Sequence, residues 1–153
     1  MLNGQGLPCP HVILELDVDT AERATEALWA RLGALASPCL ISQAPAVLAR
    51  LKEGRGGLAD GVAIPHARLP QISVPVSAFA RLARPVAFDA LDGRPCDLIY
   101  MLLSPLSPEG AHLKALARAS RYFRREPVRR ALRNASGREA LCAVFARPAA
   151  QAA

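Results

Sequence analysis

The chain has 153 residues, of which 52% are hydrophobic and 21% are charged. This composition is typical of a globular domain and excludes an intrinsically disordered chain, which would contain fewer apolar residues. No apolar run approaches the roughly 18 residues that a membrane-spanning helix needs, and the N-terminus lacks the features of a signal peptide. We therefore expect a cytoplasmic protein without stable membrane insertion. It should form one domain over residues 1–153, with an ordered core from about 9 to 146 and a loose tail at 147–153.

The net charge is +6, and the excess is concentrated near the C-terminus. Between Arg118 and Arg147 there are nine arginines and two glutamates. Such a stretch could form a nucleic-acid surface, a solvated helix face or a docking patch for an acidic protein. The arginines at 121, 124, 125 and 129 follow helical spacing, and the stretch contains few aromatic residues and little glycine. These features favour a helix face or a protein docking patch, and we expect no nucleic-acid partner.

The four cysteines give no sign of metal or redox chemistry. Cys9, Cys39, Cys96 and Cys142 lie far apart, and no two of them form a Cys-x-x-Cys pair. Isolated thiols in a reducing compartment are usually small core residues. We therefore expect neither a zinc knuckle nor a redox motif, and we assign these cysteines no chemistry.

The first half of the chain predicts one strand and two helices. Residues 11–16 form an apolar strand pattern, and Asp19 or Thr20 can cap a helix that extends to about residue 35. Ser42 opens a second helix over residues 43–52, before a glycine-rich loop at 54–57. The residues expected to face the core are Ala24, Leu28, Leu32 and Leu35 in the first helix, and Val47, Leu48 and Leu51 in the second.

The second half predicts three strands followed by three helices. The strand candidates are residues 62–64, 74–82 and 96–103, with a turn at Asp92-Gly93. The helix candidates are 109–125, 127–132 and 138–145, and the apolar stripe of the first contains Leu113, Leu116, Ala117 and Phe123. Because helices occur before, among and after the strands, the sequence predicts an α/β fold. We expect a single mixed sheet of about five strands with helices on both faces.

His66 is the strongest candidate for a functional residue. It ends the run from Gly61 to His66, in which Pro65 fixes its own φ and biases Ile64 toward an extended conformation. The run therefore predicts a short strand that leads into a bend, with His66 at the strand end. A near-neutral imidazole there could act as a base, a metal ligand or a nucleophile, or it could be a hydrogen-bonded structural residue.

Two further residues could act with His66. His112 falls in the first turn of the predicted helix 109–125, where free N–H groups and the helix dipole favour an anion. Arg50 lies near the end of the second helix, just before the glycine-rich loop. Taken alone, each of these side chains is more often an ordinary surface residue than a functional one.

Together these motifs resemble the enzyme IIA component of the bacterial phosphotransferase system. The resemblance covers residues 46–145 and includes Arg50, the run Gly61–His66, the block Phe88–Leu98 and the helix start at His112-Leu113-Lys114. Each motif is weak alone, but they occur in the order and at the spacing of the family. The sequence is most similar to the mannitol/fructose class and, within it, to the nitrogen-regulatory proteins.

The resemblance implies a phosphoryl carrier that is not an independent catalyst. His66 would accept a phosphoryl group from an HPr-like phosphocarrier, His112 would hydrogen-bond the phosphoryl oxygens, and Arg50 would donate to the same oxygens. The phosphorylation state would then regulate protein targets. Nothing in this scheme requires a metal or a cofactor.

The chain departs from the family pattern at three positions. Leu51 stands where the family has a glutamate, and Arg55-Gly56 stands where it has a serine-threonine pair. Two alternatives therefore remain beside a nitrogen-type regulator. One is a sugar-specific IIA component that passes the phosphoryl group to a IIB subunit. The other is an IIA-like binding module that is no longer phosphorylated.

Overall fold

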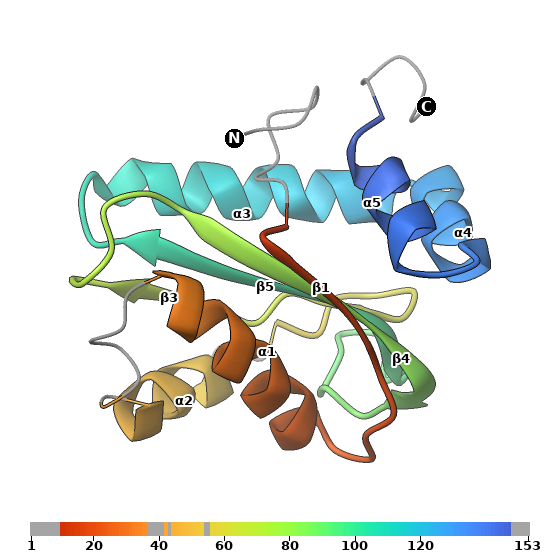
Figure 1. The fold of residues 1–153 in the computed structure, drawn as a ribbon, viewed down its shortest axis with the longest axis horizontal. Coiled ribbons are helices and arrows are strands. Elements are labelled where there is room, and N and C mark those ends of the chain that lie inside the picture. The colour runs from red at the N-terminus through yellow and green to blue at the C-terminus, as the bar shows by residue number, and fades with distance from the viewer. Residues whose placement is uncertain (1–9, 37–41, 43, 54–55, 148–153) are drawn as a thin grey trace.

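The computed structural model describes residues 10–36, 42, 44–53 and 56–147, and these form a layered α/β fold (Figure 1). The strands are β1 (Val12–Leu16), β2 (Val62–Ala63), β3 (His66–Leu69), β4 (Val76–Val86) and β5 (Cys96–Pro105). The helices are α1 (Ala21–Ala36), α2 (Ala44–Glu53), α3 (Glu109–Arg124), α4 (Glu126–Asn134) and α5 (Arg138–Phe145). The predicted fold class is confirmed: one mixed sheet of five strands has helices on both faces.

The sheet is built around β4 and β5, which pair antiparallel over most of their length. Strand β1 pairs with β4 in parallel at one edge. Strands β2 and β3 both pair with β5 in parallel, one after the other, at the opposite side. This arrangement makes β2 and β3 a single interrupted edge, with His66 beside Leu102 of β5.

The helices form two layers because successive side chains of a strand point to opposite faces of the sheet. Helices α1 and α2 lie on one face, and α3, α4 and α5 lie on the other (Figure 1). The aromatic residues Phe79, Tyr100, Tyr122, Phe123 and Phe145 gather in the core beneath α3 and α5. The long α3 therefore packs firmly on the face of the sheet toward which Ile64 points.

The predicted helices are confirmed, with small shifts at their ends. Thr20 begins α1, since its hydroxyl accepts a hydrogen bond from the main-chain N–H of Arg23 at 3.1 Å. The prediction that Leu35 faces the core is wrong. Leu35 is 66% exposed, because the last turn of α1 extends past the core. The prediction that Leu113 and Ala117 of α3 face the core is also wrong. These are exposed, whereas His112, Ala115 and Ala119 are buried.

The edge formed by β2 and β3 corrects the expectation of one strand followed by a bend. The chain stays extended after Ile64. His66 is therefore the first residue of a second strand, β3, and does not follow the last strand residue at a bend. Pro65 interrupts the strand because it has no N–H to donate, although its carbonyl still accepts a hydrogen bond from Leu102 of β5 at 2.9 Å. His66 is therefore held on an edge strand and not in a loop.

The cysteines are only partly as expected. Cys96 is fully buried at the start of β5, and burial raises the pKa of its thiol to about 11. Cys142 is exposed on α5, so the expectation of a core residue is wrong there. Cys9 and Cys39 lie outside the described residues. No helix within the described ranges is both long and apolar enough to cross a membrane.

Arg81 of β4 fastens the C-terminal end of α4 to the sheet. Its side chain is 16% exposed and forms an ion pair with Glu15 of β1. Its Nη1 donates to the carbonyl oxygens of Leu132 at 2.9 Å and Ala135 at 2.6 Å. A cation at the end of a helix satisfies carbonyl groups that have no partner within the helix.

We predict that Arg81→Met lowers the free energy of unfolding by about 1–3 kcal/mol, because it leaves partly buried acceptors without a donor. Arg84→Met is the matched control, since Arg84 also lies on β4 and pairs with Asp17 at 3.0 Å, but is 70% exposed. The control should cost less than about 1 kcal/mol. Urea unfolding followed by circular dichroism measures both, and equal losses would show that Arg81 is not a structural anchor.

Candidate functional site

The side chains of β3 alternate between the two faces of the sheet. Ala67 and Leu69 are buried in the core under α1 and α2. His66 and Arg68 therefore point to the opposite side, on which α3 lies. His66 is half-buried and Arg68 is exposed, so both remain accessible at the edge of the sheet.

The ring of His66 is oriented by the main chain just before it. Nδ1 lies 2.7 Å from the carbonyl oxygen of Ile64. A carbonyl oxygen can only accept, so this contact requires a hydrogen on Nδ1. In the neutral imidazole the lone pair available for reaction is then on Nε2. The main chain thus selects both the orientation and the tautomer of His66.

His112 faces His66 from the start of α3. The two ring centroids are 5.5 Å apart, and the ring planes meet at 44°. His112 is 7% exposed, and its Nδ1 has no hydrogen-bond partner among the described residues. Burial lowers the pKa of His112, and the neighbouring His66 and Arg68 lower it further, which favours the neutral form of the ring. The two rings are close enough to reach one bound anion.

Two arginines lie beside the histidines. Arg50, exposed near the end of α2, donates from Nη1 to the main-chain carbonyl of Arg68 at 3.1 Å. It thus reaches around the sheet edge from the opposite layer, and it contacts β3 instead of either imidazole. The guanidinium of Arg68 lowers the pKa of His112, which places its charge within electrostatic reach of the site.

The glycine-rich segment before His66 folds back on β2 as a hairpin. The N–H of Ile64 donates to the carbonyl of Gly56 at 2.8 Å, and Gly57 bridges Ala63. Gly56 has a φ of +66°, and a Cβ added there would lie 2.0 Å from the carbonyl oxygen of Ile64. Only glycine therefore allows the chain to lie so close to the carbonyl that orients His66.

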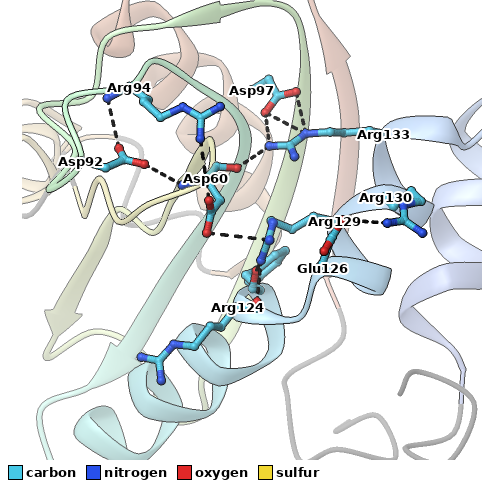
Figure 2. A network of polar contacts seen from close by, with 10 residues as sticks. Asp60, Asp92, Arg94, Asp97, Arg124, Glu126, Arg129, Arg130 and Arg133 are labelled. Carbon is cyan, nitrogen blue, oxygen red and sulfur yellow. Dashed lines mark hydrogen bonds and ion pairs between the residues drawn. The ribbon is translucent and has the colours of Figure 1, made fainter.

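A network of charged residues holds the other end of this hairpin (Figure 2). Arg133 of α4 donates to both carboxylate oxygens of Asp97 and to the main-chain carbonyl of Asp60. The N–H of Asp60 donates to Asp92 at 2.9 Å, and this bond is the largest cause of the lowered pKa of Asp92. The network therefore fixes the segment 57–61 against α4 and the start of β5.

The predicted site residues come together in part. His66 and His112 converge, and Arg50 reaches the strand that carries His66 without touching its ring. Leu51 is fully buried in the core, so no carboxylate lies at that position of α2. Arg55 lies outside the described residues. Sequence reasoning missed Arg68 as a site residue, although its position two residues after His66 on a strand could have indicated it.

Within the described part of the chain, no three His, Cys, Asp or Glu side chains gather in an arrangement that could hold a metal ion. The residue before α3 is Pro108, whose side chain has no hydrogen-bonding atom, so the first turn of the helix has no side-chain cap. That turn can therefore direct main-chain N–H groups at an anion near His112.

Comparison with known proteins connects this geometry to a family. Residues 7–147 match the family described as "Phosphoenolpyruvate-dependent sugar phosphotransferase system, EIIA 2". A nitrogen regulatory protein of Bradyrhizobium diazoefficiens is 37% identical over 148 residues, which cover 96% of this chain and 97% of that protein. A fructose-specific EIIA component of Haloferax volcanii is 38% identical over 101 residues, covering 66% of each chain.

A solved structure shows the same fold. The crystal structure of nitrogen regulatory protein IIA-Ntr from Neisseria meningitidis superposes with a TM-score of 0.78 at 34% identity, over 93% of this chain and 97% of that one. The family match covers almost the whole described chain and includes both histidines. The protein therefore belongs to the type-2 EIIA family of the phosphoenolpyruvate-dependent sugar phosphotransferase system, with nitrogen regulatory proteins among its relatives.

Proposed function

We propose that this protein is a histidine phosphoryl carrier that accepts a phosphoryl group on Nε2 of His66 from an HPr-like phosphocarrier. One observation supports this proposal above the others. The hydrogen bond from Nδ1 to Ile64 leaves Nε2 with its lone pair, while His112 faces the same ring from α3. A neutral, oriented imidazole beside a potential hydrogen-bond donor is what nucleophilic attack on a phosphoryl group requires.

The transfer exchanges one phosphorus–nitrogen bond for another. The lone pair of Nε2 attacks the phosphorus of the carrier's phosphohistidine, and the bond from that phosphorus to the carrier's ring breaks. The electron pair returns to the carrier's ring, which has a hydrogen on its other nitrogen and therefore leaves as a neutral imidazole. Positive charge develops on the ring of His66, and the bond from Nδ1–H to the Ile64 carbonyl stabilises it. The protein contributes positioning and electrostatics, and needs no further catalytic group.

The surrounding residues would hold the transferred group. The lowered pKa of His112 favours its neutral form, which can donate one N–H to a phosphoryl oxygen, and the N-terminus of α3 favours the added negative charge. Arg68 supplies a nearby cation on the same side of the sheet. Arg50 could swing from the Arg68 carbonyl to the phosphoryl oxygens, because its side chain is exposed and held by one described hydrogen bond.

We further propose that the protein acts in the cytoplasm as a nitrogen-type regulator, whose protein targets respond to its phosphorylation state. The long match to the nitrogen regulatory protein of B. diazoefficiens favours this assignment over a sugar-specific component. The match to a fructose-specific component keeps transfer to a IIB subunit as the alternative. An IIA-like module without phosphorylation is the third possibility, because the Ser-Thr pair of the family is replaced here.

The first prediction concerns the phosphorylated residue. Incubation with phosphoenolpyruvate, enzyme I and an HPr-like carrier should add one acid-labile phosphoryl group of about 80 Da. His66→Ala should abolish the mass increase, because it removes the nucleophile. His11→Ala is the matched control, since His11 lies outside the site and accepts a hydrogen bond from the N–H of Ser77. Intact-protein mass spectrometry without any increase in the wild type would leave only the binding module.

The second prediction concerns the close approach of Gly56 to Ile64. Gly56→Ala should lower the free energy of unfolding by about 1–3 kcal/mol and slow phosphorylation, because the new Cβ displaces the carbonyl that orients His66. Gly93→Ala is the matched control, since Gly93 has a φ of +72° and a Cβ added there would meet no atom within 4 Å. Gly93→Ala should lower the free energy of unfolding only by the strain of its positive φ, and it should be phosphorylated at the normal rate.

Urea unfolding and the initial rate of phosphohistidine formation measure both variants. Identical phosphorylation rates for Gly56→Ala and the wild type would show that the close packing of Gly56 is not needed for the orientation of His66.

The third prediction concerns the electrostatic role of Arg68. Arg68→Gln should raise the pKa of His112, because a nearby cation disfavours the protonated ring and its removal relieves this effect. Arg121→Gln on the exposed face of α3 serves as the control and should leave the pKa unchanged. Titration of the imidazole signals by NMR measures both. An unchanged pKa in Arg68→Gln would place the Arg68 charge outside the site.

A further inference from the structure

The exposed face of α3 carries positive charge that the phosphoryl site does not use. From Gly110 to Arg125 the chain contains five basic residues and no acidic residue. Lys114, Arg118 and Arg121 follow the spacing i, i+4, i+7, which places them on one side of the helix. They are exposed, as is Arg124 one turn further on. None of these four side chains forms an ion pair with a residue that the structure describes.

The arginines of α4 are used differently. The side chain of Arg129 is 12% exposed and donates to the carbonyl oxygens of Phe123 and Arg124, at the end of α3. Arg133 is bound to Asp97 and Asp60 (Figure 2). These two arginines stabilise the fold, so the arginine-rich stretch is not one uniform surface. The guanidinium of Arg124 points away from this network in Figure 2, and the Arg124 side chain is exposed.

A partly apolar pocket adjoins the basic face. It has a volume of about 170 Å³ and is lined by Leu58, Ala59, Asp60, Val62, Leu91, Ser120, Phe123 and Arg124. The carboxylate of Asp60 is already paired with Arg94 and Arg129. Leu91, at the tip of the turn before β5, is 88% exposed. A large aliphatic side chain so exposed beside a pocket is typical of a protein contact surface. The pocket and the cations are continuous because Arg124 belongs to both.

We propose that this surface, formed by Lys114, Arg118, Arg121, Arg124 and the pocket at Leu91, binds an acidic protein segment. Carboxylates of the partner would pair with the cations of α3, and an apolar side chain would enter the pocket. Asp92 follows Leu91 directly and would repel a ligand of uniform negative charge such as nucleic acid. A protein segment avoids this repulsion, since it can place its apolar residue there and its carboxylates along α3.

An acidic segment of this kind could belong to a target of the proposed regulator. The biological purpose of the binding rests on that proposed function, but the binding itself does not. The test uses the full-length, unphosphorylated protein, so that it can fail or succeed independently of phosphorylation at His66. The probe is a fluorescein-labelled peptide of repeating Glu-Glu-Leu. A Glu-Glu-Gln peptide of equal length and a duplex DNA are the comparison ligands.

The decisive variant is Arg118→Gln/Arg121→Gln/Arg124→Gln. The matched control, Arg23→Gln/Arg31→Gln/Lys52→Gln, removes the same number of charges from α1 and α2, on the opposite face of the sheet (Figure 1). Fluorescence anisotropy should show binding of Glu-Glu-Leu that is weakened about tenfold by the first variant and less than about twofold by the control. Leu91→Ser should weaken Glu-Glu-Leu but not Glu-Glu-Gln.

Three results would overturn the proposal. The first is no binding of the Glu-Glu-Leu peptide to the wild type. The second is an equal loss of affinity in the two triple variants, which would indicate attraction by net charge alone. The third is tighter binding of the DNA than of the peptide with the same dependence on α3, which would make the surface a nucleic-acid site. Circular dichroism of each variant verifies that its fold is unchanged.

Discussion

The hydrogen bond between Nδ1 of His66 and the carbonyl of Ile64 is the contact on which the candidate site depends. It joins two residues separated only by Pro65, and it is made here with the chain running from β2 to β3 along the sheet edge. That course is maintained by β5, to which β2 and β3 both pair in parallel. Pairing with β5 therefore helps to determine which ring nitrogen of His66 carries the hydrogen.

The same constraint explains the unusual segment before β2. The carbonyl of Ile64 must be presented to His66, while its N–H must find an acceptor of its own. Gly56 supplies that acceptor and lies too close for any side chain. The far end of the segment is fixed by Arg133 through Asp60 and Asp97. The hairpin before His66 is therefore held in two ways. Main-chain packing holds Gly56 against Ile64, and the charged side chain of Arg133 holds Asp60.

Much of this arrangement can be predicted from the sequence, and the exceptions have physical causes. The order of strands and helices follows from periodicity, and Thr20 is recognisable as a helix cap. The predicted inward face of α3 is misplaced because a hydrophobic pattern gives weight to Leu113. The structure buries His112 and small alanines instead, since the helix lies close to the sheet and beside His66. A rule based on hydrophobicity cannot place a histidine in a core.

The convergence of His66 and His112 cannot be derived from the residues alone. The two lie 46 positions apart in sequence, and only their resemblance to a family connects them. The register between β3 and β5 brings them together. His66 pairs with Leu102 near the end of β5, and α3 begins shortly after β5 ends. Strand register depends on long-range pairing, which local patterns do not contain.

The candidate phosphoryl site and the proposed docking surface share α3: the first lies at the start of the helix, and the second extends from Lys114 to Arg124. His112 and Arg124 are twelve residues apart, which is about 18 Å along a helix and more than twice the Debye length of about 8 Å at physiological salt. A phosphoryl group on His66 would therefore act on Lys114 but would be screened from Arg124. A partner bound only at Leu91 and Arg124 would not sense the charge. A partner whose binding depends on phosphorylation must extend along α3 to Lys114, so the length of its contact decides whether it is regulated.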